Sequence, residues 1–173
     1  MNYFEFYELD ESFSVDEKVV KHKFYQLSKK YHPDFYANED EAKQQEILEL
    51  STLNNKAYKV LSDPNKRIEY ILQQHNLLAD GDKYKLAPAF LMNMMEINEA
   101  ITEIEDEQSL NAIKIQITVM NAELDEELSS AIKNYETDDE ADKNAILNTI
   151  KDIYYRQKYL LRIKDTLNTF AAR

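Results

Sequence analysis

The chain has 173 residues, a formal net charge of -12 and 43% hydrophobic residues, with no cysteine and one glycine. This length and apolar content predict a folded protein with one sizeable core or two small ones, while the negative charge disfavours nucleic acid and anionic membranes as partners. The missing cysteines exclude disulfides, thiol nucleophiles and protein-ligated iron–sulfur clusters, and the single glycine excludes glycine-rich phosphate loops.

Helix-forming residues dominate the long segments, prolines occur only three times, and no apolar run reaches the length of a membrane span. Together these features predict an all-α protein without a membrane-spanning helix. The first residues match neither a secretory signal nor an organellar transit peptide. We therefore expect a cytoplasmic protein.

Four helices are expected in the first part of the chain. They are predicted over 3–9, from Ser14 or Asp16 to about His32, over 41–61, and from Pro64 to about His75, with a loop from Asp34 to about Asp40. Pro33 ends the second helix because it disfavours helical geometry in the residue before it, and Pro64 suits a first helical position. The second helix carries a single apolar stripe, formed by Val20, Phe24, Leu27 and Tyr31.

A bundle of three helices is expected in the second part, after a linker. The linker covers 76–87, where the helical pattern breaks around Gly81. The bundle helices are predicted from Pro88 to about Asp106, from a cap at Ser109 to about Thr137, and from after Asp139 to about Thr169. Their short connections predict an antiparallel arrangement, so residues 1–75 and 88–173 would form two domains.

The charge is distributed unevenly between these parts. Fourteen acidic residues and two lysines lie between Glu96 and Glu140, so this segment accounts for the whole net charge. In contrast, five lysines and no carboxylate lie between Glu17 and Asp34. The chain is therefore basic early and acidic late.

A His-Pro-Asp motif, formed by His32, Pro33 and Asp34, follows the lysine-rich helix and precedes a helix that ends in an Ala-Tyr…Asp-Pro pattern. In this context the motif resembles that of the J-domain of DnaJ-type co-chaperones, over roughly residues 1–75. Pro33 is expected to lock a turn between two antiparallel helices and to present the other two side chains to solvent at its tip.

The resemblance implies that this tip meets the ATPase domain of a DnaK-like chaperone and stimulates ATP hydrolysis there. Four lysines would meet an acidic surface of that chaperone and steer the encounter, namely Lys21, Lys23, Lys29 and Lys30. The chain departs from the family pattern after the motif, because Phe35 and Tyr36 stand where many members carry a basic residue. A charged contact at position 35 is therefore not expected.

The first bundle helix has apolar residues on two sides. At about 100° per residue, its core side consists of Phe90, Met94, Ile97, Ile101 and Ile104. The opposite side carries an apolar patch that continues into carboxylates, formed by Leu91, Met92, Met95, Glu96, Glu99 and Glu103. Because the core is already accounted for, this face is expected to bind a partner. The alternative is that Leu91 and Met92 pack against the first domain or the linker.

The run Ala89-Phe90-Leu91-Met92 with Glu96 and Glu99, behind a J-like domain, makes the chain resemble the HscB family of co-chaperones of iron–sulfur cluster assembly. The resemblance implies that the bundle binds the scaffold protein IscU and delivers it to the DnaK-like chaperone HscA. The implied scaffold-binding residues are Leu91, Met92, Met95, Glu96, Glu99, Glu103 and Tyr155. Eukaryotic relatives often carry a targeting sequence and a cysteine-rich metal site, and neither is present here, which favours a bacterial protein.

The sequence thus favours a monomeric adaptor that is not an enzyme and needs no metal or other cofactor. The acidic runs at 123–127 and 138–140 lack the glycine and alternating ligands of an EF-hand, and His22 and His75 lack a partner at sequence spacing. The main alternative is a general J-protein with another client. A carboxylate-metal hydrolase is far less favoured, because the bundle has no Glu-x-x-His motif.

Overall fold

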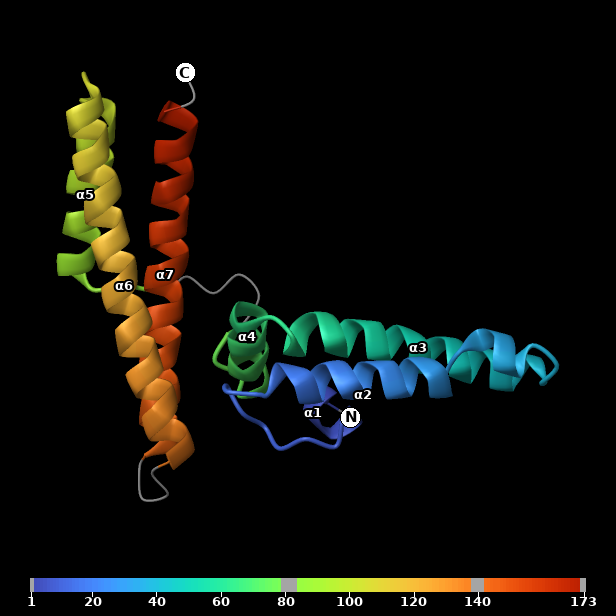
Figure 1. Cartoon of the computed structure of the whole chain (residues 1–173). Helices are drawn as coiled ribbons and strands as arrows, with labels where there is room; N and C mark the ends of the chain where they lie inside the picture. The colour runs from blue at the N-terminus through green and yellow to red at the C-terminus, as the bar shows by residue number, and fades with distance from the viewer. Residues whose placement is uncertain (1, 79–83, 138–141, 172–173) are drawn as a thin grey trace. The chain divides into compact units, whose positions relative to one another are not determined.

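The computed structural model describes residues 2–78, 84–137 and 142–171, and every regular element in these ranges is a helix (Figure 1). The predicted all-α class is thus confirmed. The chain forms two compact units, Met1–Asn76 and Leu77–Arg173, which are considered separately. None of the helices in the described ranges is long and apolar enough to cross a membrane.

The N-terminal unit is built on a long antiparallel helix hairpin. Its elements are α1 (Tyr3–Phe6), α2 (Glu17–Lys30), the 3-10 helix η1 (Pro33–Tyr36), α3 (Glu41–Leu61) and α4 (Pro64–Gln74). Helices α2 and α3 run side by side, and η1 lies in the connection at the far tip (Figure 1). The side chains of Asp16, Asp40 and Asp63 accept hydrogen bonds from amides in the first turns of α2, α3 and α4, which fixes where these helices begin.

Two expectations for this unit are wrong in detail. The first helix is shorter than expected and ends at Phe6, because Glu8 adopts a positive φ of 54° and turns the chain. The segment from Asp34 is not a loop throughout, since η1 occupies its first part. Pro33 supplies the fixed φ of a first helical position, and the His32 side chain caps this 3-10 helix.

The core of the N-terminal unit lies between the hairpin, α1 and α4. Its buried apolar side chains are Phe4, Phe6, Tyr7, Phe13, Val20, Ile47, Ala57, Leu61, Ile68, Ile71 and Leu72. Arg67 is also buried, and its guanidinium donates hydrogen bonds to the carbonyl oxygens of Phe13 and Leu61. Because carbonyls at a helix end lack partners within the helix, Arg67 satisfies the end of α3 and ties it to the segment before α2.

A polar network crosses this core. Asn54 of α3 is 1% exposed and accepts a hydrogen bond from the Tyr7 hydroxyl at 2.9 Å. Its amide nitrogen donates to Ser28 Oγ at 2.9 Å and to the Phe24 carbonyl at 3.1 Å. The buried amide is therefore satisfied and joins α2, α3 and the chain after α1. Burial, followed by the nearby Tyr58, raises the pKa of the Tyr7 hydroxyl.

We expect Tyr7→Phe to lower the free energy of unfolding by about 1–2 kcal/mol at neutral pH, because it leaves the Asn54 oxygen without its buried donor. The folded-state pKa of Tyr7 lies above the unfolded value, so this hydroxyl stabilises the fold at neutral pH and the contribution is lost as the pH rises through about 10 and above. When the free energy of unfolding is measured with urea across this pH range, it should decline less steeply for the variant than for the wild type.

The matched control is Tyr25→Phe, because Tyr25 is 60% exposed. This control should change neither the stability at neutral pH nor its alkaline decline. Equal stability of the wild type and Tyr7→Phe at neutral pH would contradict the role given to the network.

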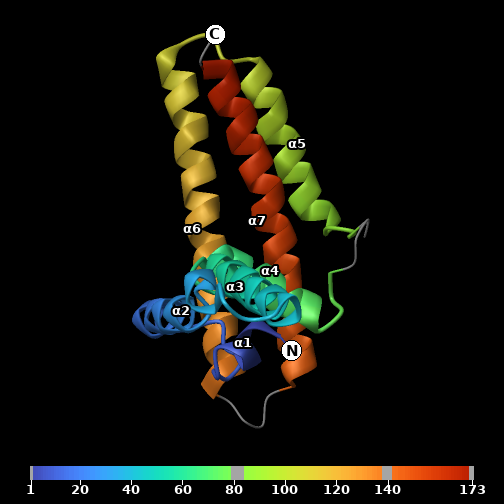
Figure 2. The same cartoon turned by 90° about the vertical axis from the view of Figure 1, so that its right-hand side faces the viewer.

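The C-terminal unit consists of α5 (Pro88–Thr102), α6 (Glu107–Thr137) and α7 (Lys143–Ala171). Helices α6 and α7 form a long antiparallel pair, and α5 lies beside the C-terminal part of α7 (Figure 2). Because α5 has 15 residues against 31 and 29, it covers only one end of the pair. The core side chains include Met94, Ile97, Ile101, Ile113, Ile117, Leu124, Ile150, Ile153, Leu160, Ile163 and Leu167.

The junction between α5 and α6 differs from the expectation. Helix α5 ends at Thr102 instead of about Asp106, because Asp106 is the residue that precedes and caps α6. Its carboxylate accepts a hydrogen bond from the Ser109 amide at 2.7 Å, so Asp106 and not Ser109 caps α6. This hydrogen bond lowers the pKa of Asp106. Phe90 and Ile104, both predicted for the core, are half-buried.

Part of the predicted linker is packed. Tyr84 and Leu86, near its end, are half-buried, and the Tyr84 ring stacks on that of Tyr155 in α7 with centroids 4.6 Å apart. The segment before α5 therefore belongs to the C-terminal unit. Gly81 of the linker and the helix break expected at 138–139 lie outside the described residues.

Candidate functional site

The His-Pro-Asp motif occupies the tip of the α2–α3 hairpin. Helix α2 ends at Lys30, His32 has an extended backbone with φ -73° and ψ 123°, and Pro33 is the first residue of η1. His32 Nδ1 accepts a hydrogen bond from the Asp34 amide at 3.3 Å and lies 3.7 Å from Asp34 Oδ2. The motif thus folds on itself through Nδ1, and Nε2 is the ring nitrogen left for a partner.

This tip is exposed and is also held to the end of α2. The side chains of His32 and Asp34 are 52% and 85% exposed, and Phe35 is 68% exposed with its ring 5.7 Å from the imidazole. The Tyr36 hydroxyl donates to the Lys30 carbonyl at 2.9 Å. One short 3-10 turn therefore presents an imidazole, a carboxylate and a phenyl ring together.

The four lysines predicted to meet the chaperone are not equivalent. Lys21, Lys29 and Lys30 are exposed, whereas Lys23 is half-buried with its Nζ 2.5 Å from Glu8 Oε2. The hydrogen bond from Lys23, and then its charge, lower the pKa of Glu8. Lys23 is therefore engaged within the unit, and the other three predicted lysines carry exposed positive charge on α2.

Sequence reasoning missed Tyr25, which lies on the same surface. It is 60% exposed and stands one turn from both Lys21 and Lys29 on α2. Two features of the sequence could have identified it. Tyr25 is four residues from each of these lysines, and it is not part of the apolar stripe of the helix. An exposed aromatic ring between two cations is suited to binding a protein surface.

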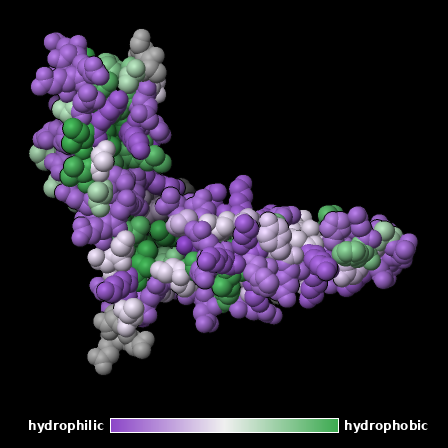
Figure 3. Space-filling view, viewed as in Figure 1, coloured by the Kyte–Doolittle hydropathy of each residue, from purple (hydrophilic) through white to green (hydrophobic). Residues whose placement is uncertain are grey.

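On the C-terminal unit, the face of α5 that was predicted to bind a partner is largely exposed. Met92 and Met95 are 62% and 59% exposed, and Glu96, Glu99 and Glu103 are exposed as well. This face therefore combines adaptable apolar contacts with negative charge. In the view of Figure 3, where α6 lies in front of α5, hydrophobic side chains also gather among polar ones on the upper part of the unit.

Leu91 and Tyr155 lie at the border of this surface. Both are half-buried, and they line one groove together with Tyr84 and Leu86 of the preceding segment. The alternative that Leu91 packs near the linker is therefore correct in part, whereas Met92 remains exposed. Of the seven predicted scaffold-binding residues, five are exposed on or just after α5 and two line this groove.

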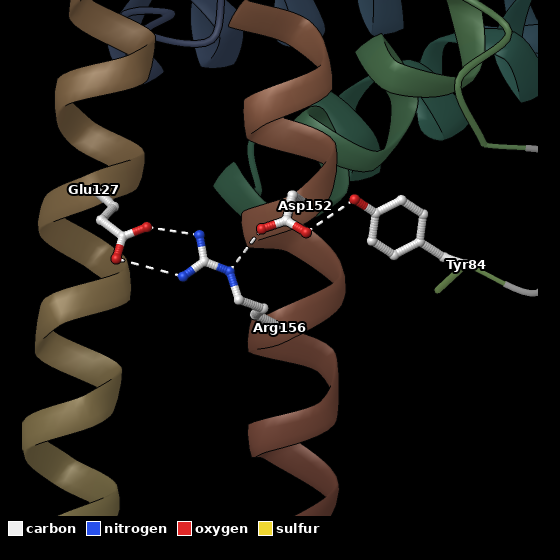
Figure 4. A network of polar contacts seen from close by, with 4 residues as sticks. All are labelled: Tyr84, Glu127, Asp152 and Arg156. Carbon is white, nitrogen blue, oxygen red and sulfur yellow. Dashed lines mark hydrogen bonds and ion pairs between the residues drawn. The ribbon is translucent and has the colours of Figure 1, made fainter. Parts of the chain in front are cut away.

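A chain of polar contacts holds Tyr84, and through it the groove, in place (Figure 4). The Tyr84 hydroxyl donates to Asp152 Oδ1 at 2.8 Å, and Asp152 Oδ2 lies 2.8 Å from Arg156 Nε. Arg156 Nη2 in turn donates to Glu127 of α6 at 2.6 Å. Burial, followed by the hydrogen bond to Asp152, raises the pKa of Tyr84. The contacts of Tyr84 with Asp152 and of Arg156 with Glu127 join residues far apart along the chain, so the sequence marks only the i, i+4 pair of Asp152 and Arg156.

Two histidines outside the motif are also candidate residues. His75 Nε2 lies 2.7 Å from Glu11 Oε1, a partner 64 residues away that sequence spacing hides, and His22 is exposed on α2. Within the described residues, no three His, Asp or Glu side chains converge as metal ligands. The geometry of both surfaces suits the recognition of other proteins.

Two family models match the chain, one described as "DnaJ domain" over residues 2–70 and one as "HSCB C-terminal oligomerisation domain" over residues 86–168. The chain is 31% identical to the iron-sulfur cluster co-chaperone protein HscB of Homo sapiens, over 96% of this chain and 67% of that protein. It is 33% identical to a co-chaperone protein HscB homolog of Vibrio vulnificus, over 76% of this chain and 82% of that protein. The crystal structure of the human co-chaperone HscB aligns with a TM-score of 0.73 at 28% identity, over 98% of this chain and 81% of that chain.

These similarities extend across both units. The match to the DnaJ domain includes the exposed His-Pro-Asp tip, and the match to the HscB C-terminal domain includes all of α5 and α6. The aligned regions cover 67% of the human protein and 82% of the Vibrio vulnificus protein. The chain therefore belongs to the HscB family of J-domain co-chaperones of iron–sulfur cluster assembly.

Proposed function

We propose that this protein binds an IscU-like scaffold protein through its C-terminal bundle and delivers it to an HscA-like chaperone, whose ATPase it stimulates through the His-Pro-Asp tip. The proposal gives one partner to each unit. It places the protein in the bacterial cytoplasm as a monomeric adaptor, where the iron–sulfur cluster is the cargo of the scaffold and not a cofactor of this chain.

The chaperone surface is proposed on α2 and η1. Lys21, Lys29 and Lys30 provide exposed positive charge that attracts an acidic surface from a distance, and they do so less at high salt. The tip then supplies groups that act at short range, since His32 and Asp34 are exposed while the backbone that carries them is held by local hydrogen bonds. Long-range steering and a preorganised tip are the two properties that a transient activator needs.

The observation that carries the scaffold assignment is the exposed pair Met92 and Met95 beside carboxylates on α5. The core of the unit is complete without them, because Met94, Ile97 and Ile101 of the same helix are each at most 2% exposed. Two methionines that contribute so little to the core are available to adapt to a partner. The adjacent carboxylates would bind basic groups of the scaffold and set its orientation.

Two surfaces on one chain have a further consequence for the chaperone. A scaffold bound to the bundle stays near any chaperone bound to the N-terminal unit, so its effective concentration there rises without a tighter contact on either side. Each contact can then be weak enough to release once the cluster has been transferred.

The test combines two measurements on the full chain. The cluster-free scaffold protein of the same organism is titrated into it by calorimetry, and single-turnover ATP hydrolysis by the organism's DnaK-like chaperones is measured with each protein alone and with both. We expect saturable binding, and a larger stimulation with both proteins than with either one. Stimulation without any scaffold binding would favour a general J-protein with another client, and no stimulation at all would contradict the chaperone assignment.

A further inference from the structure

We infer that the scaffold-binding surface extends from α5 across the groove on α7, and that this groove takes an apolar side chain of the scaffold with a neighbouring carboxylate that pairs with Arg162. This inference rests on the proposed function. It adds a second contact region with the opposite sign of charge to that of α5.

The groove has a volume of about 710 Å³ and lies between α7, the start of α5 and the segment before it. Tyr84, Leu86 and Leu91 line it from the α5 side, and Tyr155 and Tyr159 line it from α7. All five residues are half-buried. Their side chains thus form an apolar surface that a partner can reach. Because each side chain is also partly packed against its neighbours, this surface has a defined shape.

The aromatic wall is fixed in place by contacts within the unit. The Tyr84 and Tyr155 rings stack with an interplanar angle of 8°, and Tyr159 contacts Phe90 edge-to-face at 6.1 Å. The hydroxyl of Tyr84 is anchored to Asp152 in the network of Figure 4. Because these rings lose little freedom when a partner binds, the groove has the preorganisation that strong interface contacts require.

The rim of the groove is positive, in contrast with the carboxylates on the face of α5. Arg162 is exposed and its guanidinium lies 4.9 Å from the centre of the Tyr159 ring. It makes no ion pair with any residue that the structure describes. A guanidinium held over an aromatic ring keeps its edge for bidentate binding of a carboxylate. Lys158 on the same rim adds a second positive charge.

The groove continues directly into the face of α5. Leu91 belongs to both surfaces, and Met95 and Glu99 follow it at intervals of one helical turn. A partner that covers the whole surface meets cations on α7 and carboxylates on α5. A scaffold with the complementary order of charges would bind in one orientation, because the reversed orientation places like charges together.

The test is the charge reversal Lys158→Glu/Arg162→Glu, measured by calorimetry with the cluster-free scaffold protein at low and high salt. At low salt we expect the variant to bind the scaffold about tenfold more weakly than the wild type does. As the salt concentration rises, the affinity of the variant should fall less than that of the wild type. Arg162→Gln, which removes the positive charge but keeps a polar side chain, should weaken binding about threefold. Both changed positions are exposed on α7, and thermal unfolding followed by circular dichroism confirms that the variants fold.

The matched control is Lys114→Glu/Lys164→Glu, which makes the same change in charge. These lysines line a different groove, between α6 and α7, so the dissociation constant should stay within about twofold of the wild type. Equal weakening by this control would overturn the inference, because the effect would then reflect overall charge.

Other outcomes separate this inference from the proposed function. An unchanged affinity of the Lys158/Arg162 variant, together with weakened binding by changes at Met92 and Met95, would overturn the groove assignment and leave the proposed function standing. Absence of binding by the wild type would reject both. If the reversal instead removes a concentration-dependent dimer seen by sedimentation and leaves scaffold affinity unchanged, the groove holds a second copy of this chain and the inference is wrong.

Discussion

His32→Gln is expected to reduce stimulation of the chaperone to the basal ATPase rate while leaving scaffold binding unchanged. The substitution removes the Nδ1 acceptor for the Asp34 amide, the ring contact with Phe35 and the Nε2 atom left for a partner. Because the side chain is exposed, the free energy of unfolding should change by less than about 0.5 kcal/mol. Single-turnover ATP hydrolysis with the cognate chaperone measures the loss directly.

His22→Gln provides a matched control for this experiment. His22 is also exposed on α2 but lies ten residues before the tip, so this variant should stimulate as the wild type does. The assignment of the tip is wrong if His32→Gln stimulates normally. A loss in both variants would instead point to a general effect on α2.

The double substitution Met92→Ala/Met95→Ala is expected to weaken scaffold binding about 30-fold. A few central residues typically carry most of an interface's binding energy, and the substitution truncates two residues that we place in that role. The two side chains are 62% and 59% exposed, so their loss should not destabilise the bundle. Stimulation of the chaperone in the absence of scaffold should also stay unchanged. Calorimetry gives the affinity, and the ATPase assay supplies the second readout.

The chain offers a close control for these methionines on another helix. Ile115 and Val119 of α6 are 64% and 51% exposed and stand one turn apart. Ile115→Ala/Val119→Ala removes a similar exposed apolar surface, and it should leave scaffold affinity within about twofold of the wild type. If this control weakens binding as much as the methionine variant, the contact surface is centred on α6 and the assignment of α5 is incorrect.

Helix positions set by local chemistry were predictable from the sequence. Helix α3 spans the expected 41–61, and Pro64 and Pro88 open helices as expected, because a fixed φ and a missing amide act within one turn. The outward face of α5 was predictable for the same reason, since helical periodicity places Met92 and Met95 away from the core.

Features that depend on distant partners were not predictable. Asp106 and Ser109 are both good caps three residues apart, and sequence alone does not decide between them. The Tyr84 anchor on Asp152 spans 68 residues, and the bonds of Asn54 span 26 to 47. The pairing of Lys23 with Glu8, which separates it from the other lysines, likewise appears only in the folded chain.

The buried amide of Asn54 also constrains how the two hairpin helices can slide past each other. A shift of α2 by one turn along α3, about 5.4 Å, would move Ser28 and the Phe24 carbonyl away and leave buried polar groups unpaired. Such a shift would also change the span that η1 has to bridge, and with it the fold of the turn around His32. A residue inside the core thus selects a single helix register and, through it, the shape of a surface that it never touches.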